Sequence, residues 1–196
     1  LSTNYKRNEK SVGAFFEYNY DNLDNVSLSA GLRIDDHNLL GTFITPRLHV
    51  KYTPWETGTF RVSAGRGKKS AAIFAENQWL FGTNRTLKIT NNNGEYYGLN
   101  PEIAWNYGAS FTQKFDFLNR KGDITFDFYK TDFNEQIIVD MENPSEISFY
   151  NATSNSKANS FQVEVNYSPF IHFSIKTAYK YQDIKNGYIS GSKQQP

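Results

Sequence analysis

Cysteine and histidine often carry chemistry in proteins, and this chain contains few of either. It has no cysteine, which excludes a disulfide framework, thiolate metal sites and a thiol nucleophile. The three histidines, His37, His49 and His172, are widely spaced, and none is spaced from Asp or Glu as metal ligands usually are. We therefore expect no metal site, no cofactor and no enzymatic activity.

One glycine-rich run has a superficial likeness to a phosphate-binding loop. The run is Gly65-Arg66-Gly67-Lys68-Lys69-Ser70, but Val62 stands where the first glycine of that motif belongs. Lys and Arg number 21 and Asp and Glu 20, a balance that supplies no global field for nucleic acid. Nucleotide and nucleic-acid binding are therefore not expected.

Two groups of residues are better suited to binding. The first lies in the segment between 67 and 101, where rigid rings and a guanidinium group could meet a ligand: Trp79, Phe81, Arg85, Tyr96 and Tyr97. The second comprises charged residues on the polar faces of predicted strands: Glu17, Arg33, Arg47, Lys51, Arg61 and Lys176. Loop packing is the alternative role for the first group. For the second group, the alternative is an aqueous wall without a particular partner.

Strands must position these residues, because apolar and polar side chains alternate with a period of two in about eight segments. The predicted strands are 12–20, 26–35, 47–52, 60–65, 106–117, 124–128, 161–168 and 171–181. Both His49 and His172 fall on polar faces of these strands. A short helix could form in 71–80, but no run approaches the roughly 20 apolar residues of a membrane-spanning helix.

The predicted connections alternate between short and mostly longer ones. Those at 21–25, 54–58, 118–122 and 168–169 are short and rich in turn-forming residues, whereas 67–101 and 134–157 are long. The chain also has 16 Phe, 13 Tyr and 3 Trp, and its aromatic residues gather beside the short connections. Outer-membrane barrels combine short periplasmic turns, longer extracellular loops and aromatic girdles. The pattern therefore predicts such a barrel.

A membrane barrel also reverses the usual orientation of the two faces. We expect one group to lie on the convex, lipid-facing surface: Phe111, Val163, Val165, Ile171, Phe173 and Ile175. A second group should point into the concave interior: Arg33, Arg61, Lys114, Glu164 and Lys176. A soluble barrel or sandwich would bury the first group and expose the second.

Three stretches resemble sequences of TonB-dependent receptors, especially those of the Bacteroidetes type. They are Phe60-Arg61-Val62-Ser63-Ala64-Gly65-Arg66-Gly67, the run from Gly98 to Gly108 that contains Leu99-Asn100-Pro101-Glu102, and Phe126 to Phe133 followed by Gln136-Ile137-Ile138-Val139. The chain departs from the family pattern at Lys68-Lys69. The resemblance implies a closed barrel of about 22 strands with a plug domain in its lumen.

The expected fold class is all-β: an antiparallel transmembrane β-barrel fragment whose eight or so strands form an open curved sheet with two unpaired edges. Residues 1–196 would form part of one barrel domain, with the plug domain, the signal peptide and the terminal strands lying outside this sequence.

The resemblance further implies an uptake receptor in the bacterial outer membrane. Its substrate would be a ferric siderophore, a cobalamin-like chelate or an oligosaccharide. Its partners would be membrane lipid, its own plug and, through the plug, TonB. The charged residues of the second group would then face the plug. The alternatives are a passive porin or another outer-membrane barrel, and a soluble β-sandwich that binds carbohydrate or acts in adhesion.

Overall fold

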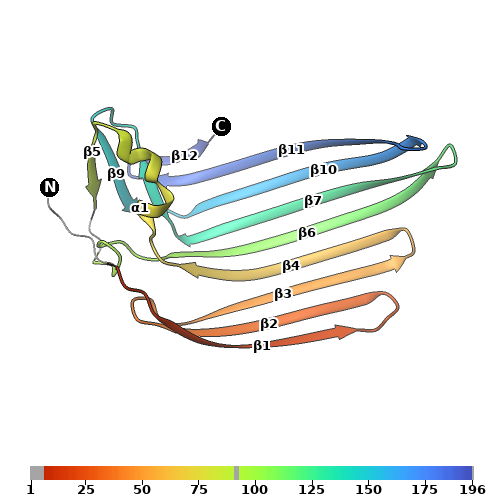
Figure 1. The fold of residues 1–196 in the computed structure, drawn as a ribbon, viewed down its shortest axis with the longest axis horizontal. Coiled ribbons are helices and arrows are strands. Elements are labelled where there is room, and N and C mark those ends of the chain that lie inside the picture. Colours follow the sequence, from red (N-terminus) through yellow and green to blue (C-terminus); the bar gives the residue numbers. More distant parts are fainter. Residues whose placement is uncertain (1–6, 91–92, 196) are drawn as a thin grey trace.

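A single large antiparallel sheet dominates the computed structural model, which describes residues 7–90 and 93–195. Its strand order is β1-β2-β3-β4-β6-β7-β10-β11-β12 (Figure 1). The strands are β1 (Ser11–Asp21), β2 (Val26–His37), β3 (Gly41–Trp55), β4 (Gly58–Lys69), β6 (Glu102–Phe117), β7 (Arg120–Glu135), β10 (Ser156–Phe170), β11 (Phe173–Tyr188) and β12 (Gly191–Gln195). The eight long strands correspond to the eight predicted ones, and β12 is a short addition.

The sheet is open, as expected for part of a larger barrel. Strand β1 pairs with β2, and β12 pairs with β11, whereas β1 forms no ladder with β11 or β12 among the described residues. Two edges therefore expose backbone groups that could pair with further strands.

Four tight turns lie together at one end of the sheet (Figure 1). One was misplaced by the sequence analysis: Pro169 lies inside β10, and the turn is formed by Ile171 and His172. The pairing shifts register between Tyr167 and Phe170, and a proline without an N–H is tolerated at such an irregularity. The predictions that placed Ile171 and His172 on strand faces were therefore wrong.

Two long connections dominate the opposite end. They contain α1 (Ile73–Glu76), the 3₁₀ helix η1 (Gln78–Gly82), β5 (Thr86–Ile89), β8 (Ile137–Asp140) and β9 (Glu146–Asn151). Strand β5 pairs in parallel with β9, which pairs with β8, so the two connections form one body that we call the loop unit. The β2–β3 and β11–β12 connections at this end are short, so only two of the four are long.

The hydrophobic core of the described residues sits in the loop unit. Its buried members are Ala71, Ile73, Leu80, Tyr96, Leu99, Ile138, Ile147, Phe149 and Tyr150. The long strands contribute no large apolar side chain to this group, and many of theirs are exposed, including Val62 (55%) and Ile175 (46%). A β-sandwich would cover one face with a second sheet. In the described structure, no second layer covers the apolar residues of the long strands.

The pairing register places apolar residues of all eight long strands on one face. One row across the sheet is Tyr20, Leu28, Val50, Val62, Ala109, Phe128, Phe161 and Tyr181. The residues of the opposite face are mostly polar. This confirms the two-faced pattern that the alternation predicted.

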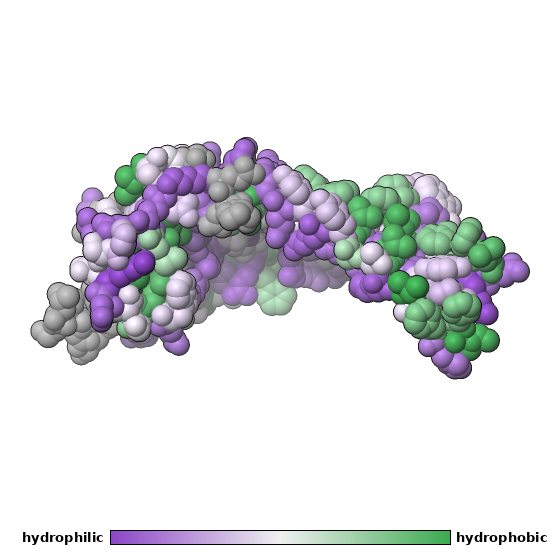
Figure 2. Space-filling view, turned by 90° about the horizontal axis from the view of Figure 1, so that it is seen from above, coloured by the Kyte–Doolittle hydropathy of each residue, from purple (hydrophilic) through white to green (hydrophobic). Residues whose placement is uncertain are grey.

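An aromatic belt crosses the apolar face beside the short turns. Phe60 stacks on Phe111 with centroids 4.4 Å apart, and Trp55 contacts both rings edge-on. Gln113, a polar residue on this face, accepts a hydrogen bond from Trp55 Nε1 at 3.1 Å. Figure 2 shows apolar residues gathered over the turn-bearing half of the arched molecule. Amphipathic rings such as that of Trp55 favour the level of lipid headgroups.

Candidate functional site

Two regions hold the residues that the sequence singled out, and the first is the polar face of the sheet. All six predicted wall residues share this face, and so does His49. Depressions of about 350 Å³ and 400 Å³ open on it, lined by side chains that include Arg33 and Arg47 in one case and Lys51 and Arg61 in the other. The polar face is therefore the hollowed one.

Glycine at one wall position lets a long side chain cross a whole strand. Arg47 on β3 bonds Glu17 on β1 by passing over Gly31 of the intervening strand. A Cβ on Gly31 would lie 2.5 Å from Arg47 Nε and 2.8 Å from Arg47 Cγ. The missing side chain thus clears the path for this ion pair, which the sequence alone did not reveal.

The wall residues differ in how they are neutralised within the sheet. Arg33 Nη2 lies 2.6 Å from Asp35 Oδ1 on its own strand. Lys176 Nζ lies 2.8 Å from Glu164 Oε1 on the neighbouring strand. With the Glu17–Arg47 pair, these contacts account for four of the six predicted wall residues. Lys51 and Arg61 form no ion pair with any residue that the structure describes.

The second region is the loop unit, which holds the predicted ligand contacts. Trp79 on η1 is 68% exposed, and Phe81 is 40% exposed with its ring 5.5 Å from Phe74. Arg85 is half-buried and donates to the carbonyl of Met141 at 3.5 Å. Trp79, Phe81 and Arg85 therefore retain accessible surface.

Tyr96 and Tyr97 are more buried than Trp79. Tyr96 is 2% exposed in the core, with the guanidinium of Arg7 4.9 Å from its ring centroid. Tyr97 is half-buried, and its ring meets Phe74 edge-on at 4.9 Å. Tyr96 thus supports the loop unit from within, and its burial leaves little surface for a ligand. Loop length and composition did not distinguish it from its exposed neighbours.

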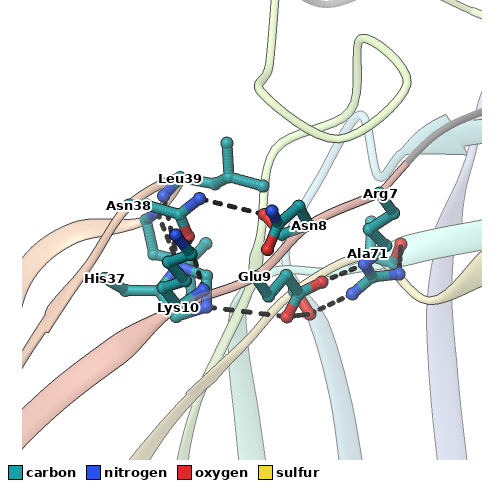
Figure 3. Close-up of polar contacts among 10 residues, drawn as sticks. Arg7, Asn8, Glu9, Lys10, His37, Asn38, Leu39 and Ala71 are labelled. Atoms are coloured by element: carbon teal, nitrogen blue, oxygen red, sulfur yellow. Dashed lines mark hydrogen bonds and ion pairs between the residues drawn. The ribbon is translucent and has the colours of Figure 1, made fainter.

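A polar cluster fastens the loop unit to the chain before β1 (Figure 3). Arg7 pairs with Glu9 and donates to the carbonyl of Ala71 at 3.1 Å. Glu9 Oε2 in turn lies 3.5 Å from Nε2 of His37, at the start of the β2–β3 turn. Burial tends to raise the pKa of Glu9, but the hydrogen bond and charge of Arg7 outweigh it and hold that pKa below its ordinary value.

A second attachment joins the loop unit to the β11–β12 turn. The Tyr150 hydroxyl donates to Asp140 Oδ2 at 2.8 Å and accepts from the Ile189 backbone N–H at 3.1 Å. Thr153 Oγ1 also donates to the carbonyl of Tyr188 at 2.9 Å. The loop unit is therefore braced on both sides of the sheet end. Neither attachment could be predicted from the sequence, because each joins segments that are far apart along the chain.

Two further features are absent from the part of the chain that the structure describes. No group of three or more His, Asp or Glu residues is placed to hold a metal ion there. No helix in the same residues is long and apolar enough to cross a membrane.

An open, hollow antiparallel sheet with an uncovered apolar face and a braced loop unit defines a segment of an outer-membrane type of barrel. The family model for the TonB-dependent receptor-like β-barrel matches residues 1–195, so the chain belongs to this family. Members of the family are outer-membrane transport receptors rather than enzymes, and they bind a plug domain, TonB and substrates. No curated protein matches the sequence.

Solved structures share the fold at low sequence identity. The FrpB iron transporter from Neisseria meningitidis aligns with a TM-score of 0.66 and 15% identity over 93% of this chain and 27% of its own. The siderophore receptor PirA from Pseudomonas aeruginosa aligns with a TM-score of 0.59 and 19% identity over 91% of this chain and 33% of its own. The chain thus spans about a third or less of these proteins.

Proposed function

We propose that the protein containing this chain is a TonB-dependent receptor that takes up a scarce nutrient across the bacterial outer membrane, and that it is not an enzyme. In this proposal the wall of the hollow face surrounds a plug domain, and the loop unit faces the cell exterior. The observation that carries the proposal is the match to the family over residues 1–195. The uncovered apolar face of the sheet supports a membrane location.

The substrate classes expected are a ferric siderophore, a cobalamin-like chelate and an oligosaccharide. The neighbouring structures are a siderophore receptor and an iron transporter, which favours the first class. On the loop unit, Trp79, Phe81 and Arg85 offer accessible rings and a guanidinium group to such a substrate. Tyr97 is half-buried beside Phe74 and would support the ring of that neighbour.

An uptake experiment on the full-length protein tests this function. Cells that lack the gene are expected to lose uptake of one substrate class from a panel of ferric siderophores, cobalamin and oligosaccharides, and loss of TonB should have the same effect. The Trp79→Ala, Phe81→Ala double variant should lower substrate binding without lowering the amount of protein in the outer membrane.

A matched control for the loop variant is Leu118→Ala. Leu118 is 78% exposed in the β6–β7 turn, at the opposite end of the sheet, so its replacement should leave binding unchanged. Recovery of the parent protein in the soluble fraction, or uptake that persists without TonB, would contradict the proposal.

A further inference from the structure

Lys51 and Arg61 stand directly opposite each other on the polar face, on β3 and β4. Their other cross-strand neighbours are Ser27 and Ser110, which carry no charge. Like charges directly opposite each other destabilise a sheet. The pair therefore has an electrostatic cost, and no ion pair with a described residue offsets it.

A second cation pair in the sheet provides a comparison. Lys157 and Lys185 are also cross-strand partners, but Asp132, which forms an ion pair with Lys130, lies opposite Lys157 on its other side. The Lys51–Arg61 pair lacks such a neighbour. Asp21 lies beyond Ser27 and Asp127 lies beyond Ser110 in the same row, and neither forms an ion pair with Lys51 or Arg61.

The surroundings of the pair suit an oxygen-rich anion. The depression of about 400 Å³ that contains Lys51 and Arg61 is also lined by Ser27, Ser29, His49, Ser63, Ser110 and Tyr129, among others. An ionised carboxylate accepts hydrogen bonds only, and it bonds most strongly to cationic donors. Ammonium, guanidinium and hydroxyl donors therefore line one depression.

We propose that Lys51 and Arg61 form a carboxylate-binding site on the barrel wall, occupied by an Asp or Glu side chain of a protein segment inside the lumen. Lys51 and Arg61 are both exposed, whereas a site for a small free ligand normally encloses most of the ligand. A carboxylate on a segment held in the lumen binds at a high effective concentration and does not need enclosure. The inference rests on the proposed function, which places such a segment there.

Zero-length coupling tests this site in the purified full-length protein. A carbodiimide joins a lysine amine to a carboxylate in contact with it. We expect Lys51 to be coupled to an Asp or Glu outside residues 1–196, detected by peptide mass spectrometry. Since β3 and β4 are interior strands of the sheet, such a carboxylate reaches Lys51 through the lumen.

Lys176 provides an internal standard, because its contact with Glu164 should give a coupled product within the sheet. The Lys51→Arg variant keeps the charge but removes the amine, so it should lose the Lys51 product and retain the Lys176 product. Heat-modifiable gel mobility confirms that this variant folds.

Two results would overturn the inference. In the first, Lys51 is coupled only to carboxylates within 1–196 or reacts freely with an acetylating reagent. In the second, Lys51 is protected from acetylation but coupled to no protein carboxylate, which would assign the site to a soluble anion. Either result leaves uptake unaffected and is thus distinct from failure of the proposed function.

Discussion

Tyr150 combines burial with two hydrogen bonds at the junction between the loop unit and the β11–β12 turn. Burial is the main cause that raises its pKa to about 12, and the neighbouring Asp140 carboxylate contributes. The hydroxyl must stay protonated to donate to Asp140, so the junction depends on the neutral phenol.

This dependence predicts weakening at high pH. The pKa in the folded state exceeds the ordinary value of 10.0, so the stabilisation is complete below pH 10.0 and is lost as pH rises towards about 12. Protease cleavage within 141–145 should therefore increase across this window. Tyr150→Phe should remove this part of the pH dependence. Equal pH dependence in both proteins would argue against the assignment.

At the other attachment, the lowered pKa of Glu9 predicts weakening at low pH. Its pKa is lowered, so the Arg7–Glu9 contact stabilises the folded state above the ordinary value of 4.5 and is lost as pH falls through the folded-state pKa. Hydrogen exchange of residues 70–75, corrected for the intrinsic effect of pH, should accelerate in acid. Glu9→Gln should already show faster exchange at neutral pH, and identical protection in the variant would refute the role.

At the scale of elements, the loop unit is the part of the chain with its own buried core. Phe149 on β9 is 1% exposed, and replacing a buried phenylalanine by alanine typically costs about 3–5 kcal/mol. Phe149→Ala should lower the free energy of local opening, measured by hydrogen exchange of β5 and β9, while the long strands stay protected. Trp79→Ala is the matched control, because this exposed ring should contribute little to stability.

The elements differ in how readily the sequence reveals them. Long strands such as β6 repeat the apolar–polar alternation often enough to be recognised, and their faces follow from it. Strands β5 and β8 have four residues each, too few to show a period, and β5 depends on a parallel partner in another loop. The turn after β10 was misplaced because Pro169 indicated an end where the strand contains only an irregularity.

The candidate sites on the polar face and the loop unit could also be predicted only in part. Alternation placed all six wall residues on polar faces, because the face on which a residue lies follows from its position within its own strand. Which of them are neutralised depends on side chains that reach across strands, as Arg47 does over Gly31. The burial of Tyr96 depends on how two distant loops meet.

For the whole molecule, the membrane assignment predicts opposite outcomes for adjacent residues. Val163 lies on the apolar face of β10 and Gln162 on the polar face. Val163→Arg should destabilise the barrel in a bilayer by about 2–4 kcal/mol, the cost of arginine near the midplane. Urea unfolding in lipid vesicles measures this effect.

Gln162→Arg adds the same side chain to the other face and should cost much less. A soluble protein that buries the apolar face would also be damaged by Val163→Arg, but it would unfold reversibly without lipid. Equal sensitivity of the two positions would contradict the assignment of faces.

The parallel pairing of β5 with β9 also constrains the order of events during folding. These two strands lie on opposite sides of β6 and β7 in the chain, so their contact joins segments that this whole hairpin separates. Contacts between distant segments form slowly, because the chain entropy of the intervening loop must first be lost. The loop unit would accordingly be the last part to mature, and an immature barrel would present two separate, protease-sensitive loops in place of the single surface that the proposed function assigns to recognition.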